Sequence, residues 1–542
     1  MTFSEFSLVL REIEQTTLRN QMMEKLAALF AKSSAEEIAP VVYLSLGCLR
    51  PKFDRLEFNL AEKMVIRAIA RAYDTKPDEV TALYKEKGDL GIVAEQLRSA
   101  KSVVRSPEIS IIEVYERLEE IAREEGQGSQ ERKVDGVATL LQQVDALSAR
   151  YITRMVVGKL RLGVSDKTIL DALSFMESGN KQGRDQLDFA YQVSPDIGQI
   201  ARLVKEHGVA KVATEVKVTF GVPVVPALAQ RLKTAAEMID KMGAVALEPK
   251  YDGTRVQIHF SRSRESGAGS QKDKGQLFAE EKKQDFEVRT FTRNLDENSL
   301  MFPELQRIAG QIQADEVILD SEAVGFNPTT GAMLPFQMTI TRKRKHGIGQ
   351  ATQDVPLKFF VFDILYKNGE SLIEKPFRER REILTNTIRK GKVLEVDTYK
   401  ETNDPQTIRD YHQQQLDAGL EGAMVKQIDG EYSPGRTGFN WVKFKEAEES
   451  SGKLNDTVDV VVMGYYRGKG KRTVFGMGAF LAGVLDEHGT VVTLAKIGTG
   501  LTDEQWREMK ERCLQFEVAE KPKNFGRVEK IIMPDVWVNP SI

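Results

Sequence analysis

The spacing of hydrophobic positions changes twice along the chain and divides it into three parts. Over residues 1–217 apolar side chains recur every three to five positions, which predicts an all-α region. Residues 218–447 begin with a proline-marked extended segment, Val222–Ala227, and continue with strands and shorter helices that predict an α+β domain. Residues 448–542 carry short alternating strands, a pattern typical of a small β-barrel. We therefore expect a multidomain fold with these three parts in this order.

One string between two predicted helices departs from the pattern of an amphipathic face. In Gly158–Gly163 (GKLRLG), two glycines bracket a lysine and an arginine. The string fits an ordinary helix corner with solvated charges. It also fits a loop whose backbone lies against phosphate, because glycine allows close approach and basic side chains neutralise charge. The pattern leaves both interpretations open, and Gly158, Lys159, Arg161 and Gly163 are the candidate contacts.

The turn Glu248–Arg255 (EPKYDGTR) is the most informative stretch of the middle region. It follows the apolar run Val245–Leu247 and precedes the alternating run Val256–Phe260. Lys250 is therefore predicted to lie at a turn between two strands. A lysine in such a turn is usually a surface residue. It acquires a chemical role only if the rest of the chain supplies cations for phosphate, carboxylates for a metal and a surface for a base.

Three acidic positions downstream could supply the carboxylates. Asp320 and Glu322 alternate within the apolar run 317–323, so both should project from the same face of a strand. Glu421 stands just before another short apolar run. A solvated strand face would give the same pattern, and this alternative stays open.

Aromatic and basic positions could supply the rest of a nucleotide site. Phe362 lies inside the strand-like run 359–366, where it is either a core residue or a base-stacking surface. Lys443 and Lys445 are two positions apart and share one strand face, as in any half-exposed strand. Together with the carboxylates they assemble the parts of a polyphosphate site.

Composition limits the classes of partner. The 77 basic and 80 acidic residues give a net charge of −3, so a nucleic-acid partner would need local basic patches. The two cysteines exclude a four-cysteine zinc site and a disulfide framework, and they fit a reducing compartment. We see no secretory signal and no apolar run long enough for a membrane span. A cytoplasmic protein without membrane association is expected.

Taken in chain order, these strings resemble the nucleotidyltransferase motifs of ATP-dependent DNA ligases. Glu248–Arg255 resembles the first motif, and the string Thr292–Asn294 and the strands with Glu322 and Phe362 follow in family order. Segments that resemble the family's helical DNA-binding domain and its OB-fold domain lie outside this core: Gly88–Gly91, Gly158–Gly163, Tyr432–Arg436, Gly468–Arg472, Lys496–Gly500 and Pro534–Val538. The resemblance implies a helical DNA-binding domain at 1–217, an adenylation domain at 218–447 and an OB-fold domain at 448–542.

The family chemistry would centre on Lys250. The resemblance implies that this lysine attacks the α-phosphate of ATP and forms a lysyl–AMP phosphoramidate. A free lysine, with a pKa of about 10.4, is almost wholly charged at pH 7, so nearby cations would have to favour its neutral form. AMP would then pass to the 5′-phosphate of a nick, and the 3′-hydroxyl would displace it. The implied partner is nicked double-stranded DNA.

The other site residues take their expected roles from the same resemblance. Glu248 would accept from the adenine amino group and Phe362 would stack on the base. Arg255 and Glu322 would contact the ribose. The remaining expected contacts are phosphate at Arg293, Lys443 and Lys445, a divalent metal (Mg²⁺ or Mn²⁺) at Glu322 and Glu421, and DNA at Gly158, Lys159, Arg161 and Gly163. A monomer is expected, and a sliding clamp is a candidate partner.

Two departures from the family pattern stand out. The family joins the strand after the lysine motif to the next one by a short turn, whereas residues 262–284 are inserted here. Family members also continue past the region of Trp537 to a basic RxDK motif, whereas this sequence ends at Ile542 without one. We therefore expect an incomplete OB-fold, and slower self-adenylylation than sealing of pre-adenylylated nicks.

Other functions remain to be weighed. RNA ligases and capping enzymes share the core motifs, but not the helical domain with its Gly158–Gly163 string. An NAD-dependent ligase would need a tetracysteine zinc module, which two cysteines cannot build. A nick-binding protein that has lost self-adenylylation is the non-enzymatic alternative. Whether ADP or GTP can replace ATP stays open.

Overall fold

The structure is a computed structural model that describes residues 1–54, 56–100, 108–262, 285–327, 329–334, 338, 355–436, 438–444, 459–468, 470–487 and 489–539. Lys445 and nearly all of the 262–284 insertion therefore lie outside the described residues. The chain divides into two compact units. One holds Met1–Ala61, Ser106–Val144 and Met155–Ser451, and the other holds Glu62–Arg105, Asp145–Arg154 and Gly452–Ile542. The predicted boundaries at 217 and 447 stay a prediction.

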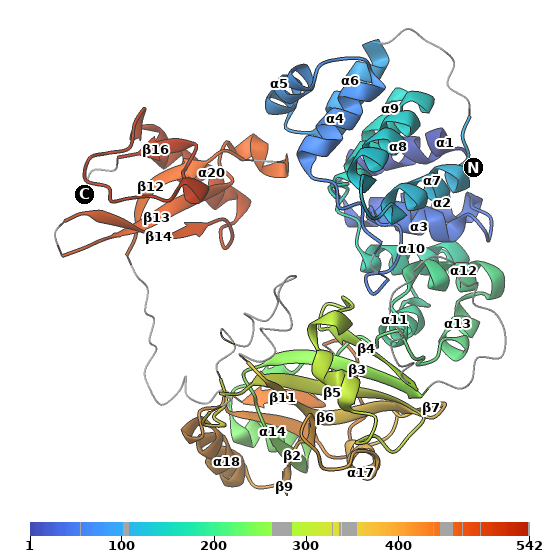
Figure 1. The fold of residues 1–542 in the computed structure, drawn as a ribbon, viewed down its shortest axis with the longest axis vertical. Helices are drawn as coiled ribbons and strands as arrows, with labels where there is room; N and C mark the ends of the chain where they lie inside the picture. Colours follow the sequence, from blue (N-terminus) through green and yellow to red (C-terminus); the bar gives the residue numbers. More distant parts are fainter. Residues whose placement is uncertain are drawn as a thin grey trace. The chain divides into compact units, whose positions relative to one another are not determined.

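The N-terminal part is helical, as its spacing predicts (Figure 1). The first helix shows why the sequence folds this way, because Thr2 and Glu5 form a capping box at its start. The first unit contains α1 (Phe3–Glu14), α2 (Arg19–Lys32), α3 (Ile38–Leu46), α7 (Ile111–Arg123), α8 (Ser129–Gln143), α10 (Asp166–Ser178), α11 (Arg184–Val193), α12 (Ile197–His207) and α13 (Val209–Glu215). The second contains α4 (Glu62–Ala72), α5 (Pro77–Lys87), α6 (Leu90–Ala100) and most of α9 (Ala146–Val156).

Two sheets build the middle region of the first unit. The larger sheet has the order β4-β3-β5-β6-β7, with β8 paired to β6. Its strands are β3 (Thr254–Arg262), β4 (Phe286–Thr292), β5 (Glu316–Gly325), β6 (Leu357–Lys367), β7 (Glu370–Ser371) and β8 (Leu394–Val396). The smaller sheet has the order β1-β11-β10-β2-β9. Its strands are β1 (Gln230–Leu232), β2 (Val245–Pro249), β9 (Lys400–Thr402), β10 (Ala423–Gln427) and β11 (Trp441–Phe444).

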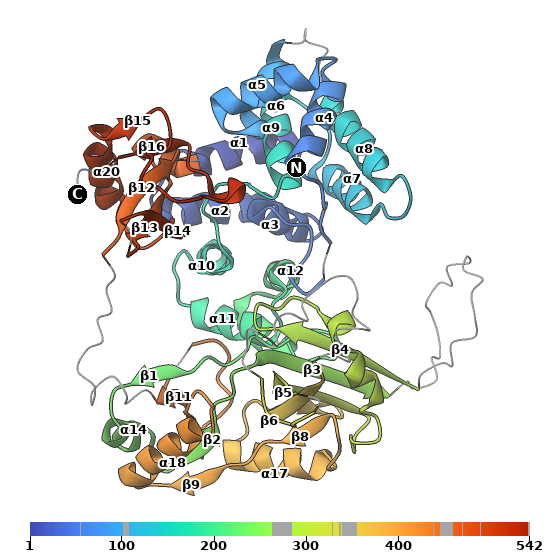
Figure 2. The ribbon, with the colours of Figure 1, turned by 60° about the vertical axis from the view of Figure 1, so that its left-hand side comes forward.

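Helices cover the outer faces of both sheets. α14 (Ala235–Met242) and α18 (Pro405–Asp417) pack on the smaller sheet through a core that includes Met238, Ile408 and Val425. α17 (Phe377–Thr387) and the 3₁₀ turns Ser299–Met301 and Pro303–Arg307 lie against the larger sheet (Figure 2). Burial of these apolar faces leaves the opposite face of each sheet for polar side chains.

The two-residue period of each strand decides which side chains share the inner faces. On the larger sheet Val256, Leu319 and Val361 point into the helix-covered core. Their neighbours in sequence, which include Arg255, Asp320 and Phe362, therefore lie on the other face. On the smaller sheet the same alternation sends Leu247, Val425 and Val442 toward the helices and leaves Glu248, Met424, Lys426, Trp441 and Lys443 on the inner face. Two polar inner faces thus come from strands with ordinary apolar alternation.

The C-terminal part of the second unit contains a five-stranded antiparallel sheet of order β14-β13-β12-β16-β15. Its elements are β12 (Val461–Tyr466), β13 (Ala479–Leu485), β14 (Val491–Ile497), β15 (Glu517–Val518), β16 (Val536–Val538), α20 (Asp503–Leu514) and the 3₁₀ turns Gly470–Phe475 and Lys530–Ile532. Trp506 of α20 is fully buried against Phe480 of the sheet. Among the described helices of both units, none has the length and apolar character needed to cross a membrane.

Candidate active site

A cavity of about 520 Å³ opens between the inner faces of the two sheets. Both sheets, the turn after β2 and the turn before β10 contribute its lining. The structure brings eight of the predicted residues to this one cavity: Glu248, Lys250, Arg255, Arg293, Glu322, Phe362, Glu421 and Lys443. These residues are up to 195 positions apart in sequence, since the first is 248 and the last 443. Their convergence supports a single site.

Lys250 lies in the turn between β2 and β3, as its flanking pattern predicts. Its backbone is fixed by two hydrogen bonds, because its N–H donates to Gly422 O at 2.9 Å and its carbonyl accepts from Glu421 N–H at 3.0 Å. The Lys250 ammonium forms an ion pair with the Glu421 carboxylate. The Lys250 side chain is about one-quarter exposed and that of Glu421 nearly half exposed, so this pair lies at the rim of the cavity.

Two glycines make this arrangement possible. A Cβ on Gly253 would lie 2.5 Å from Ala323 O and 2.9 Å from Glu322 Cγ, so only glycine lets the turn approach β5. Gly422 has φ +109°, and a Cβ there would lie 2.2 Å from the His412 ring. His412 accepts a hydrogen bond from Ala423 N–H through Nδ1 at 3.1 Å. The backbone that carries Glu421 is therefore fixed from below by α18.

The floor of the cavity holds a buried ion pair between Glu248 and Lys426. Their charged atoms are 2.5 Å apart, and each side chain is about 2% exposed. The Arg381 guanidinium lies 3.6 Å from Glu248 Oε1, without a hydrogen bond. Glu248 Oε1 has no hydrogen-bond donor among the described residues, although it is buried. A buried acceptor without a donor is costly, so this oxygen fits a donor from a bound ligand.

Asp397 lies beneath the same floor, between β8 and β9. It accepts hydrogen bonds from the Tyr251 hydroxyl at 3.0 Å and from Thr398 N–H at 2.8 Å. Burial, and then the nearby Glu248 carboxylate, raise the pKa of Asp397 to about 8. Tyr251, which follows Lys250 in sequence, also stacks on Phe360 with ring centroids 4.1 Å apart.

Aromatic rings and cations form one wall of the cavity. Phe362 and Trp441 meet edge to face, with ring centroids 5.8 Å apart. The Lys426 ammonium lies 4.7 Å from the Phe362 ring and 4.2 Å from the Trp441 ring. Arg255 lies 5.3 Å from both rings. The positions of both rings are thus fixed by cation–π contacts.

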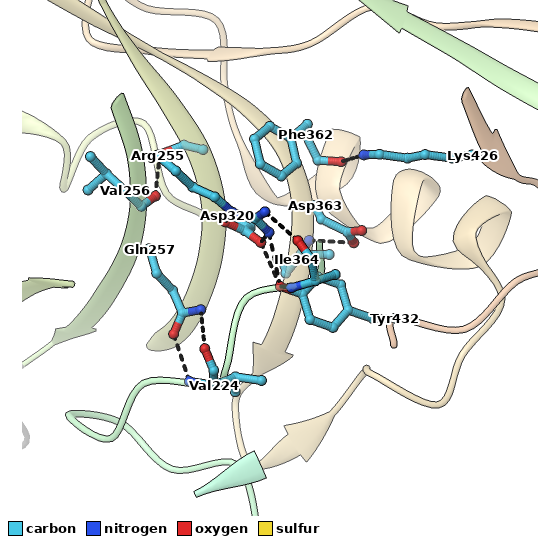
Figure 3. Close-up of polar contacts among 12 residues, drawn as sticks. Val224, Arg255, Val256, Gln257, Asp320, Phe362, Asp363, Ile364, Lys426 and Tyr432 are labelled. Atoms are coloured by element: carbon cyan, nitrogen blue, oxygen red, sulfur yellow. Dashed lines mark hydrogen bonds and ion pairs between the residues drawn. The ribbon is translucent and has the colours of Figure 1, made fainter. Parts of the chain in front are cut away.

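Arg255 and Glu322 also line the cavity, and Arg255 is bound to Asp320 of β5 (Figure 3). Asp320 is fully buried and receives the Arg255 guanidinium, so it is not the solvated strand face that the sequence left open. Glu322 is half-buried at the cavity. Burial raises the pKa of Glu322 to about 8, against the opposing charges of Arg255 and Lys250.

The Gly158–Gly163 string is an inter-helix loop, as predicted, between α9 and α10. Gly158, Arg161 and Gly163 all have φ between +63° and +74°. Leu160 and Leu162 are buried, whereas Lys159 is exposed and Arg161 half-exposed. The two leucines anchor the loop, and the basic side chains alternate with them.

Several residues of the cavity lining have no predicted role from the sequence, among them Lys426, Asp397, Trp441 and Arg436. The sequence pattern could have indicated Lys426, because a lysine two positions after Met424 in a strand lies on the same strand face as Met424. Asp397 has no such pattern around it, since it stands in a short connection without periodicity.

The described part of the chain contains no cluster of three or more His, Cys, Asp or Glu residues that could hold a metal by itself. Glu322 and Glu421 both line the cavity, so two carboxylates are within reach of one ligand. Such a pair suits a hard cation that also takes oxygens from phosphate and water.

Comparisons with known protein families cover most of the chain. Residues 226–445 match the ATP dependent DNA ligase domain, residues 2–174 match the DNA ligase N terminus, and residues 473–542 match the ATP dependent DNA ligase C terminal region. The cavity residues described above all fall within the first of these matches.

Proteins that are similar over the whole of this chain are also named as DNA ligases. The chain is 38% identical over 543 residues to a probable DNA ligase of Dictyoglomus turgidum, with 100% of this chain and 88% of the relative covered. It is 36% identical over 551 residues to a DNA ligase of Pyrobaculum arsenaticum, with the same coverage. A solved structure named Pmar-Lig_Pre. shares the fold, with a TM-score of 0.51 and 16% identity over 93% of this chain and 91% of that one.

Proposed function

The chain belongs to the ATP-dependent DNA ligase family, and from that premise we propose which residues carry the reaction. The protein seals nicks in duplex DNA at the expense of ATP, through lysyl–AMP and DNA–adenylate intermediates. The match at residues 2–174 favours a DNA ligase over an RNA ligase or capping enzyme. The observation that carries the residue assignment is the convergence of Lys250 and a buried, unsatisfied Glu248 oxygen on one cavity.

The floor of the cavity is the site for the adenine ring. Glu248 Oε1 lacks a donor among the described residues, and the adenine amino group is a donor of the right kind. Phe362 offers its ring for stacking on the base. Lys426 holds the Glu248 carboxylate in place through their ion pair. Guanine carries a carbonyl oxygen where adenine carries the amino group, so this floor favours ATP over GTP.

Lys250 is the nucleophile of this proposal. An ammonium group has no lone pair, so Lys250 must leave its pairing with Glu421 and lose a proton to solvent before it attacks the α-phosphate. The new P–N bond forms as the bond between the α- and β-phosphates breaks, and pyrophosphate leaves. Lys443, and by resemblance Lys445, add positive charge to the phosphate end of the cavity, which favours loss of that proton. The same cations stabilise the charge that develops on phosphate during transfer. Arg293 stands at the exposed edge and fits a phosphate contact.

Glu322 and Glu421 are the residues that would hold a divalent metal, Mg²⁺ or Mn²⁺. Their oxygen donors fit such an ion, which binds through one or two carboxylates together with substrate phosphates. When bound, the ion neutralises phosphate charge. Glu421 would hold the ion through the same carboxylate that pairs with Lys250 in the structure.

The other parts of the chain serve the DNA. We assign DNA binding to the helical region 1–217, with Gly158, Lys159, Arg161 and Gly163 as contacts to the phosphate backbone. We assign the OB-fold to residues 448–542 and the adenylation domain to residues 218–447. A monomeric enzyme that acts on DNA in the cytoplasm, with a sliding clamp as partner, completes the proposal.

A nick-sealing assay tests it with two substrates. With ATP and a nicked duplex, the wild type should seal the nick and Lys250→Ala should not. With a nick that already carries 5′-adenylate, Lys250→Ala should still seal it, because the lysine step is bypassed. Sealing by Lys250→Ala from ATP would refute the assigned nucleophile. Failure of the wild type on both substrates would refute the function.

A further inference from the structure

The Arg255 guanidinium is held by four hydrogen bonds to protein atoms. Figure 3 shows those to Asp320 and Tyr432. Nε donates to Asp320 Oδ1 at 2.9 Å, and Nη2 donates to Asp320 Oδ2. Nη1 donates to the Ala227 carbonyl at 2.5 Å, and Nη2 also donates to the Tyr432 hydroxyl at 3.2 Å. An arginine has five N–H donors, so among the described residues one is left for a ligand in the cavity that Arg255 lines.

Tyr432 connects the groups that hold this arginine. Its hydroxyl donates to Asp320 Oδ2 at 2.7 Å and accepts from Ala227 N–H at 3.0 Å. Together with the Arg255 contact, these bonds use the one donor and both acceptor positions of a hydroxyl. Tyr432 is 2% exposed. Burial and then the Asp320 charge raise its pKa, so the hydroxyl keeps the proton that it donates.

The same hydroxyl also fixes a segment of the cavity wall. Ala227, Leu228 and Ala229 line the cavity directly. This segment is tied to the Tyr432 loop a second time, because Leu228 N–H donates to Gly435 O at 2.7 Å. Removal of the hydroxyl would therefore loosen Arg255 and the Ala227 backbone together, without removing a group that touches the nucleotide.

A second arginine–aspartate pair, Arg380 with Asp363, lies next to the pair of Arg255 and Asp320 and differs from it. Asp363 lies opposite Asp320 on the adjacent strand and is bound by Arg380 at 2.8 and 3.0 Å. Arg380 and Asp363 are both fully buried and lie outside the cavity lining. Among the described residues, Arg255 thus binds Asp320 at the cavity together with the Tyr432 hydroxyl, whereas Arg380 of α17 binds Asp363 away from the cavity lining.

We propose that Tyr432 is a positioning residue for nucleotide recognition: its hydroxyl holds Arg255 so that the remaining N–H meets a ribose hydroxyl of bound ATP. This inference rests on the proposed function, because it needs a nucleotide in the cavity. Tyr432 would act on the nucleotide through Arg255, without a contact of its own to the base or the phosphates. This role accounts for a buried tyrosine whose hydroxyl forms all of its possible hydrogen bonds next to the cavity lining.

The test compares Tyr432→Phe with Tyr366→Phe in a single-turnover assay of Lys250–AMP formation. Tyr366 is a matched control, because its hydroxyl donates to Glu316 at 3.0 Å from the same large sheet but outside the cavity. Tyr432→Phe should raise the ATP concentration for half-maximal rate by about 10-fold, with the maximal rate within about twofold. Tyr366→Phe should leave both values unchanged.

Deoxyadenosine triphosphates distinguish a loss of Arg255 positioning from a general disturbance of the cavity in Tyr432→Phe. Wild-type enzyme should lose affinity for the 2′-deoxy or the 3′-deoxy analogue relative to ATP. In Tyr432→Phe that penalty should shrink, because Arg255 no longer meets the missing hydroxyl; the two changes are then non-additive. Asp320→Asn should show the same signature and carries the test if Tyr432→Phe does not fold. An ATP dependence equal to that of Tyr366→Phe, or an undiminished analogue penalty, would overturn the inference. Label on wild-type Lys250 tests the proposed function separately.

Discussion

The floor and the rim of the cavity each hold a lysine–glutamate pair, under very different constraints. Glu248 and Lys426 on the floor are about 2% exposed, whereas Lys250 and Glu421 at the rim are about 24% and 45% exposed. A buried pair cannot lose one partner without a large penalty, because the other charge is left without solvent. An exposed pair contributes little to stability and can open. The floor is therefore suited to recognise a base, and the rim to release a nucleophile.

The largest expected effect comes from breaking the floor pair. Glu248→Ala leaves the Lys426 ammonium buried without its partner, which should lower the free energy of unfolding by roughly 3–5 kcal/mol. It should also abolish detectable Lys250–AMP formation, because the acceptor for the base is lost. Urea denaturation and covalent labelling measure the two effects.

The double variant Glu248→Ala/Lys426→Met is the control for this prediction. It removes both charges, so it should regain most of the stability and none of the labelling. A Glu248→Ala protein as stable as the wild type would mean that the pair is not buried as described.

Breaking the rim pair should leave stability almost unchanged and slow the reaction. Glu421→Gln keeps the shape of the side chain at a nearly half-exposed position, so the free energy of unfolding should change by less than about 0.5 kcal/mol. Loss of the carboxylate should slow Lys250–AMP formation by roughly 10- to 100-fold and raise the Mg²⁺ concentration required. Initial labelling rates over a Mg²⁺ series provide the measurement. An unchanged Mg²⁺ dependence would remove Glu421 from the metal site.

The smallest effect concerns Asp397 beneath the floor. Its folded-state pKa of about 8 is above the ordinary value for aspartate, so the folded protein holds this proton more tightly than the unfolded chain. That contribution to stability is complete below about pH 4 and is lost as the pH rises through about 8. Asp397→Asn keeps the oxygen that accepts from Tyr251 and lacks the titration.

Denaturation of the wild type and Asp397→Asn across this pH range isolates the effect. The difference in unfolding free energy should shift in favour of Asp397→Asn as the pH rises, by at most about 1.4 kcal/mol per pH unit. A constant difference would show that Asp397 is ionised throughout.

The local sequence pattern predicted the strands and the turn that carry part of the site. Period-two alternation predicted β3, and the apolar runs 317–323 and 359–366 predicted β5 and β6. Alternation placed Asp320 and Glu322 on one strand face, and the structure brings Glu322 to the cavity. For Phe362 the sequence left a core position and a base-stacking surface open. The turn with Lys250 followed from the apolar runs on either side. The roles of these residues came from family resemblance and stay predictions, because no ligand contact tests them.

The other half depends on strand order, which local pattern does not specify. Glu248 meets Lys426 because β2 and β10 pair antiparallel, although 177 positions separate the two residues in sequence. The sequence left open whether Asp320 belongs to a solvated acidic face, and the structure buries it completely in an ion pair with Arg255. Strand pairing in the tertiary structure determines these side-chain partners, so the local sequence pattern did not predict them.

The most direct test of the account is the chemical identity of the adenylylated residue. After incubation with ATP and Mg²⁺, the protein is digested without acid, which would hydrolyse a phosphoramidate, and its peptides are analysed by mass spectrometry. We expect one AMP on Lys250, absent from Lys250→Ala, and its disappearance when a nicked duplex is added after the free ATP has been removed. AMP on a different residue, or nick sealing from ATP without any adenylylated peptide, would contradict this expectation.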